Sequence, residues 1–206
     1  MDGFLAKHPH AKYFQENQAP LHAYSFATEQ WYATHAYKFV SPEGKERFFR
    51  WRFVPWQGVM KHSAADASKQ SKTFQFDDLK WRMENNKPIK YRLLAQLAEE
   101  GDPTDDSTKT WPETNEFVEM GEVVIDGLWG KKAEGETPEE SLDRPQQRII
   151  FDPMPRQIEG IENGNDALVQ LRTSVYLKSG QIRREANGVT TKPEDYATGR
   201  CPFLSM

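Results

Sequence analysis

The sequence predicts an α+β fold with an antiparallel sheet and flanking helices, and two observations support that prediction. The first is a hairpin pattern, because two runs with alternating apolar side chains, 31–40 and 46–54, lie on either side of a Ser-Pro-Glu-Gly turn at 41–44. Runs of this kind around a tight turn are typical of paired antiparallel strands. The second is the apolar spacing over 165–176, where the period becomes helical.

The same two periodicities predict the remaining elements. Leu79 and Met83 lie four residues apart and indicate a short helix over 77–85, which Asn-Asn-Lys-Pro ends. Alternation predicts two more strands, near 89–98 and 118–126, and helical spacing predicts a helix within 1–22. Four strands are too few for a barrel that holds a ligand, which takes about eight. Either helices cover this sheet or the chain is part of something larger.

Composition excludes several classes of protein. The 206 residues include 27 basic and 31 acidic side chains, a net charge of −4, so nucleic-acid binding is excluded as the main function. No run approaches the ~20 apolar residues of a membrane span. The N-terminus also lacks the apolar stretch of a signal peptide, so we expect a soluble protein, cytoplasmic by default. The single cysteine, Cys201, excludes an internal disulfide and a cysteine-based zinc site.

Three segments occur in a specific order along the chain: Asp106–Pro112 before a strand that begins near Met120, Phe151-Asp152-Pro153 before Gly160-Ile161-Glu162, and Arg172–Tyr176 with Arg183 beyond it. This order and spacing resemble the second half of the heme catalases, and most of all the small catalase-related peroxidases. Segments 37–40, 50–55, 92–98 and 101–106 also resemble that branch. The resemblance covers most of residues 1–185.

The resemblance implies a partial catalase-like antiparallel β-barrel over 1–187, truncated at its N-terminal, distal side, followed by a tail at 188–206. It also implies heme as cofactor and hydrogen peroxide as substrate. In that family a distal histidine within Val-His-Ala-x-Gly and a distal asparagine lie upstream of this region. None of the five histidines here has that context: His8, His10, His22, His35 and His62. We therefore assign no catalytic residue.

By the same resemblance Tyr176 is the axial ligand of the heme iron, which catalases hold through a tyrosine. Arg172 lies one helical turn earlier, where a cation favours the phenolate, and Asp166 would orient Arg172. From the residues alone, Tyr176 could instead be a partly buried tyrosine beside a surface arginine. Asp166 could simply stabilise the helix dipole, since it lies near the helix start.

The resemblance assigns further heme contacts. Arg183 would pair with a propionate through its bidentate fork, and the alternative is a surface arginine. Apolar contacts to the porphyrin would come from Phe151, Leu168 and Val175, which could equally be core residues. Arg52 occupies the strand position at which large catalases carry a histidine of the proximal network, unless it is a solvent-facing strand arginine.

Three functions remain open at this stage. The first is a heme-dependent, peroxide-consuming oxidoreductase. The second is a truncated or degenerate catalase-like module that binds heme weakly or acts as a scaffold, and the third is an α+β domain with fortuitous motifs. A homo-oligomer could also bring His22 or His35 of another subunit over the heme.

Overall fold

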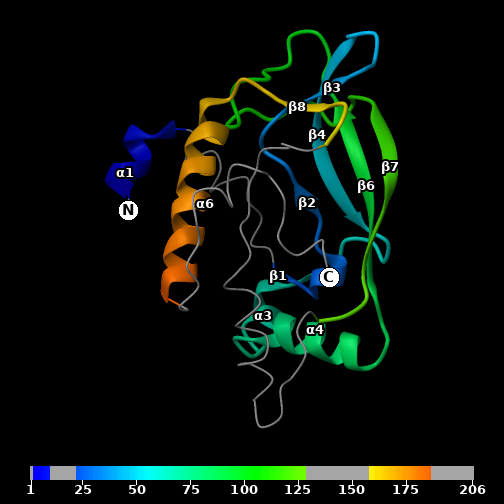
Figure 1. Ribbon diagram of the computed structural model, residues 1–206. Helices are drawn as coiled ribbons and strands as arrows, with labels where there is room; N and C mark the ends of the chain where they lie inside the picture. The colour runs from blue at the N-terminus through cyan, green and yellow to red at the C-terminus, as the bar shows by residue number, and fades with distance from the viewer. Residues whose placement is uncertain (1, 10–21, 129–157, 187–206) are drawn as a thin grey trace. The chain divides into compact units, whose positions relative to one another are not determined.

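The computed structural model describes residues 2–9, 22–128 and 158–186, and it confirms the α+β class (Figure 1). The helices are α1 (Asp2–Lys7), α3 (Ala64–Ala67), α4 (Phe74–Glu84) and α6 (Ala167–Ala186). The strands are β1 (His22–Ala23), β2 (Trp31–Tyr32), β3 (Tyr37–Val40), β4 (Glu46–Pro55), β5 (Lys61–His62), β6 (Ile89–Leu97), β7 (Phe117–Ile125) and β8 (Ile161–Asn163). Within these residues no helix is long and apolar enough to cross a membrane.

The main sheet has the strand order β7-β6-β4-β3-β8, and β2 also pairs with β4. The pairings β2–β4, β3–β4, β3–β8 and β6–β7 are antiparallel. β3 and β4 form the predicted hairpin, with Tyr37 opposite Phe49. At its turn Gly44 has a φ of 77°, a conformation that glycine adopts without steric cost. β1, β5 and β8 were not predicted, because two or three residues leave no readable periodicity.

The predicted strand over 31–40 is interrupted, since β2 ends at Tyr32 and β3 begins at Tyr37. The Ala33 N–H still donates to the Trp51 carbonyl at 2.8 Å. The Ala36 carbonyl instead accepts a hydrogen bond from the Gly164 N–H at 3.1 Å. The interruption buries His35 and Ala36, so a segment predicted as regular strand carries a side chain into the interior.

The chain forms two compact units. Unit 1 comprises Met1–Thr34, Trp51–Gln96 and Glu116–Gly127. It contains the apolar cluster of Ala27, Ile89 and Tyr91, against which five partly buried side chains pack: Phe26, Phe53, Leu79, Met83 and Val123. Leu79 and Met83 lie on α4, so the spacing that predicted this helix also identified its packed face.

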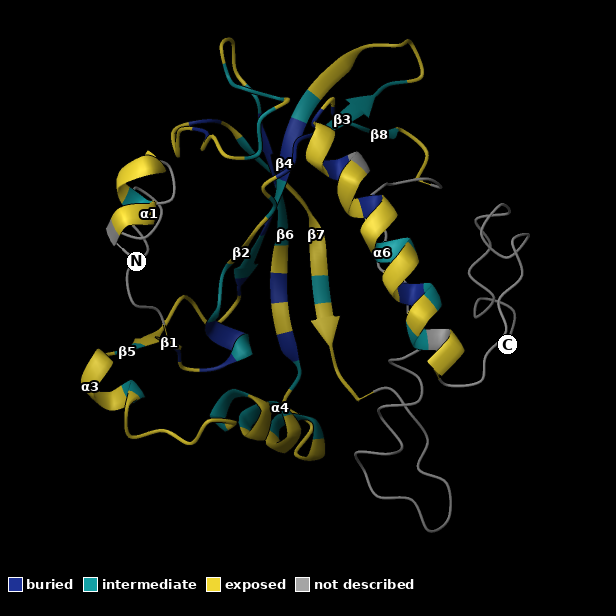
Figure 2. Ribbon diagram, turned by 90° about the vertical axis from the view of Figure 1, so that its left-hand side faces the viewer, coloured by how far each residue is buried: buried dark blue, intermediate teal, exposed yellow. Residues whose placement is uncertain are grey.

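Unit 2 comprises His35–Arg50, Leu97–Asn115 and Leu128–Met206. It includes β3, the first half of β4, β8 and α6. α6 is the helix predicted over 165–176, and it continues to Ala186. One face of α6 is buried at Val169 and Thr173, whereas other faces are exposed along its length (Figure 2). The exposed apolar side chains of α6 are Leu168, Leu171, Val175 and Ile182.

Candidate functional site

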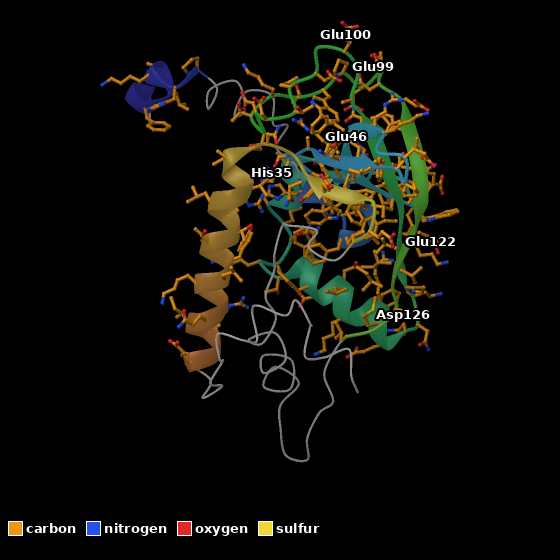
Figure 3. All side chains as sticks on the ribbon, turned by 45° about the horizontal axis from the view of Figure 1, so that its top comes forward. His35, Glu46, Glu99, Glu100, Glu122 and Asp126 are labelled. Atoms are coloured by element: carbon orange, nitrogen blue, oxygen red, sulfur yellow. The ribbon has the colours of Figure 1, made fainter. Side chains whose placement is uncertain are left out.

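Four side chains of unit 2 form a hydrogen-bonded tetrad, defined here as Asp166, His35, Arg172 and Tyr176. Asp166 lies just before α6. Arg172 and Tyr176 lie on α6 one turn apart, so helical spacing brings the side chains of these two residues together. His35 comes from the interrupted segment between β2 and β3, and Figure 3 shows it beside the first turn of α6.

The contacts of the tetrad link its four side chains in a row, and Arg172 donates to both of its neighbours. His35 Nδ1 lies 2.9 Å from Asp166 Oδ2, and Arg172 Nη1 lies 2.7 Å from His35 Nε2. Arg172 Nη2 then donates to the Tyr176 hydroxyl oxygen at 2.7 Å. His35 and Asp166 are buried, whereas Tyr176 is only partly buried. The tetrad thus leads from a buried carboxylate to an accessible phenol.

The hydrogen-bond partners fix the protonation state of His35. A guanidinium has only N–H donors, so His35 Nε2 must accept the bond from Arg172 and carries no proton. The neutral imidazole then keeps its proton on Nδ1 and donates it to Asp166 Oδ2. His35 is therefore a neutral bridge between a carboxylate and a guanidinium.

Asp166 is held in its charged form. Burial alone would raise the pKa of this carboxyl, but hydrogen bonds from His35 and from the Leu168 N–H bring the pKa below its ordinary value of 3.8. The Leu168 N–H donates to Oδ1 at 2.8 Å, so the same carboxylate caps the first turn of α6. The negative charge at the buried end of the tetrad is thus part of how α6 begins.

The accessible end of the tetrad has the chemistry that a phenolate ligand requires. The Arg172 guanidinium lies 5.3 Å from the centre of the Tyr176 ring. It also donates a hydrogen bond to the Tyr176 hydroxyl oxygen. A cation that donates to a phenol oxygen favours the phenolate. Leu168 and Val175 are 44% and 56% exposed on the same helix, which provides apolar surface near a polar ligand. These residues fit a tyrosinate-bound porphyrin.

The structure places the other predicted residues as follows. Arg183 lies on α6 and is partly buried. Leu168 and Val175 are exposed in the described structure, so reading them as plain core was wrong. Phe151 lies outside the described residues. No group of three or more His, Cys, Asp and Glu side chains within the described ranges could hold a metal ion.

Arg52 was predicted to belong to this network, and the position between Asp166 and Arg172 is occupied by His35 instead. Arg52 is buried in unit 1, where Nη2 donates to Gln96 at 3.4 Å. Its guanidinium lies over the rings of Tyr32 and Phe117. The alternative of a solvent-facing strand arginine is therefore also wrong.

His35 is the residue that sequence reasoning missed. It was considered only as a base donated by another subunit, and that role is wrong because both ring nitrogens are engaged within unit 2. The contact with Asp166 spans 131 positions in the sequence. A single sequence carries no signal for such a pairing beyond the presence of a histidine in an apolar run.

Solved structures identify the fold. A fungal catalase matches with a TM-score of 0.64 at 20% identity, covering 78% of this chain and 32% of that chain. A bacterial catalase matches with a TM-score of 0.63 at 20% identity, covering 78% of this chain and 31% of that chain. The fold is thus that of part of a catalase.

The family follows from the sequence as a whole. The family model named Catalase matches residues 13–191, and the chain belongs to the catalase family. A catalase-related peroxidase of Mycolicibacterium paratuberculosis is 30% identical over 159 residues, which are 77% of this chain and 47% of that protein. A catalase-related peroxidase of Synechococcus elongatus is 27% identical over 183 residues, 85% of this chain and 49% of that protein. The chain spans about half the length of these relatives.

Proposed function

We propose that this chain binds heme through Tyr176 and forms the proximal side of a peroxide-consuming site of the catalase and peroxidase type. The observation that carries the proposal is the tetrad, because it ends in an arginine donor on an accessible phenol oxygen. Membership of the catalase family supports heme as the cofactor and hydrogen peroxide as the substrate.

Each residue has a defined task in this proposal. Arg172 stabilises the Tyr176 phenolate, and His35 and Asp166 orient the Arg172 guanidinium from behind. Arg183 would pair with a heme propionate, and Leu168 and Val175 would supply apolar contact to the porphyrin. Bound heme supplies the redox chemistry with peroxide, since the side chains of the tetrad only bind, orient and hold protons.

A second function is favoured by a specific observation, namely that His35 has both ring nitrogens engaged. Proton transfer by a positioned base contributes about 10²–10⁴-fold to a rate. No histidine in this sequence has the context of the family's distal histidine. The alternative is a heme-binding or scaffold module with little turnover by itself.

Heme titration of the purified chain tests the binding proposal. Tyr176→Phe removes the ligand oxygen and should weaken heme uptake at least tenfold, whereas Arg172→Ala should weaken it less. Tyr24→Phe is the matched control, because Tyr24 is an exposed tyrosine of unit 1. Equal heme affinity in the wild type and Tyr176→Phe would refute the assignment of Tyr176.

An oxygen-electrode assay on the heme-loaded chain separates the two functions. Little oxygen release from hydrogen peroxide, together with normal heme uptake, supports the binding module. Turnover in the range of complete catalases supports the enzyme.

A further inference from the structure

Asn163 is followed by Gly164 at the end of β8, where the chain leads into α6 (Figure 1). An asparagine before a glycine is prone to deamidation, because no Cβ on the next residue hinders attack by its backbone nitrogen on the side-chain amide. The sequence has one other such pair, Asn187-Gly188, which lies outside the described residues. The surroundings of Asn163 and Gly164 therefore decide how fast their pair reacts in the folded chain.

The fold holds the attacking atom of this pair in place. Gly164 is buried, and its N–H donates to the Ala36 carbonyl at 3.1 Å. β8 also keeps Asn163 in extended backbone, opposite Tyr37 on β3, and closure of a five-membered ring requires the chain to leave that conformation. A nitrogen whose N–H is bonded and shielded from water is a poor nucleophile, so the reaction requires a local opening first.

The protecting contact also requires the residue that makes the pair reactive. A Cβ atom at Gly164 would lie 2.5 Å from the Ala36 carbonyl oxygen and 3.2 Å from that of Thr104, so only glycine fits there. Asn163 Oδ1 is buried and has no hydrogen-bond partner among the residues that the structure describes. The reactive amide is therefore restrained by the backbone contact of Gly164 rather than by a bond to its own oxygen.

The protecting contact lies beside the buried end of the tetrad. Ala36 follows His35, and Gly164 lies two residues before Asp166. The hydrogen bond between His35 Nδ1 and Asp166 Oδ2, at 2.9 Å, therefore joins the same two segments as the bond between Gly164 and Ala36. Because the two bonds hold the same segments together, loss of one loosens the other.

We propose that Asn163 is a deamidation site that the Gly164–Ala36 hydrogen bond blocks, and that the reaction, once it occurs, separates Asp166 from His35. An opening that lasts long enough for attack then disables the tetrad permanently. The proposal applies to the chain with or without heme and does not rest on the proposed function.

The reaction needs no cofactor or oxidant. The Gly164 nitrogen loses its proton and bonds to Asn163 Cγ, the bond from Cγ to Nδ2 breaks, and ammonia leaves with that proton. Water then opens the cyclic imide to aspartate or isoaspartate. Either product adds a carboxylate at a site where Oδ1 is buried without a donor, which is costly. Isoaspartate also lengthens the main chain just before Asp166.

Peptide mapping by mass spectrometry tests the block in the full chain without heme. At mildly alkaline pH, Asn163 should deamidate about tenfold or more slowly in native buffer than in concentrated urea, because the native state must first open. Asn187 is the internal reference in urea, where both pairs should react at similar rates. Equal rates for Asn163 in native buffer and in urea would overturn the proposal.

His35→Ala tests the link to the tetrad. This variant loses the hydrogen bond to Asp166, so it should speed both the hydrogen exchange of the Gly164 N–H and the deamidation of Asn163. His22→Ala, at an exposed histidine of unit 1, is the matched control and should change neither rate. An unchanged Asn163 rate in His35→Ala, or an equal increase in His22→Ala, would contradict the proposal.

Asn163→Asp tests the effect of the product without the reaction. The added carboxylate should speed the exchange of the Gly164 N–H and of the His35 Nδ1 proton, both measured by NMR. Asn163→Ser removes the reactive amide without adding charge and should leave both protons slow to exchange. Equal exchange in the two variants would show that the product leaves the tetrad intact and would refute the proposal, even where His35→Ala does not fold.

Discussion

The interiors of the two units differ in the acidic and histidine side chains that they bury. Unit 1 contains an apolar cluster around Ile89 and Tyr91, and the polar or charged side chains buried among its described residues are Ser25, Thr28, Arg52 and Gln96. Unit 2 buries ionisable and polar side chains on elements that are distant in sequence: His35, Arg50, Asn115, Asp166 and Thr173. Apolar burial is non-directional and tolerates small shifts, whereas buried polar groups are stable only while their hydrogen bonds are made. The comparison therefore predicts that unit 1 tolerates changes of pH that unit 2 does not.

The largest loss of unfolding free energy should follow from a substitution in the apolar cluster of unit 1. Ile89→Ala leaves a cavity at a side chain that is 1% exposed, and such changes cost about 2–5 kcal/mol. Urea unfolding should show this loss equally at pH 4 and pH 7, because burial raises the pKa of the Tyr91 phenol above 10.0 and this one ionisable group of the cluster is neutral at both pH values. Val124→Ala, at an exposed position of β7, is the control. A loss of unfolding free energy that depends strongly on pH would contradict the predicted pH tolerance of unit 1.

In unit 2 a comparable loss of unfolding free energy should follow from the addition of one methyl group at Gly164. Gly164→Ala places its Cβ 2.5 Å from the Ala36 carbonyl oxygen, so the segment that carries His35 must move away from Asp166. We expect a cost of about 1–3 kcal/mol, as for other overpacked sites. Gly127→Ala, where a Cβ meets nothing within 4 Å, should be nearly neutral. Similar losses of unfolding free energy in Gly164→Ala and Gly127→Ala would refute the close approach of Gly164 to the Ala36 carbonyl oxygen.

The pH dependence of stability should be specific to Asp166. The native pKa of Asp166 lies below 3.8, so its contribution is complete above that value and is lost as pH falls through the native pKa. Asp166→Asn lacks this contribution at every pH. The difference in unfolding free energy between wild type and Asp166→Asn, measured in urea, should therefore shrink below pH 3.8. A difference that stays constant with pH would contradict a charged Asp166.

The smallest effect should come from a surface ion pair. Lys38 Nζ lies 2.6 Å from Glu46 and 3.2 Å from Glu162, and both carboxylates are at least half exposed. Exposed pairs of this kind contribute little, since water screens the charges. Lys38→Met should leave the urea midpoint unchanged, and a clear shift would show that charge matters outside the interior of unit 2 as well.

The same difference explains what the sequence could predict. Leu79 and Met83 on α4, and the alternation in β4, β6 and β7, carry local periodicities that predicted their elements. Asp166, Arg172 and Tyr176 could be named together because they lie on or beside one helix and resemble a family motif.

The rest depends on contacts that no local pattern records. Alternation placed His35 within a continuous strand, but its hydrogen bond to Asp166 and the Ala36–Gly164 contact interrupt that strand. Arg52 was assigned to the network by its position in a motif, and its guanidinium instead lies between aromatic rings of unit 1. A buried polar interior is specified by pairs of distant residues, and one sequence does not show which residues pair.

Resonance Raman spectroscopy of the heme-loaded chain, with deuterated tyrosine as the label, tests the central claim most directly. The account predicts iron–tyrosinate modes in the wild type that shift on labelling, persist in Tyr24→Phe and disappear in Tyr176→Phe. Loss of Arg172 should change the frequency of these modes, because the Arg172 donor lies 2.7 Å from the ligand oxygen. Tyrosinate modes that survive in Tyr176→Phe, or a loaded wild type without them, would contradict the account.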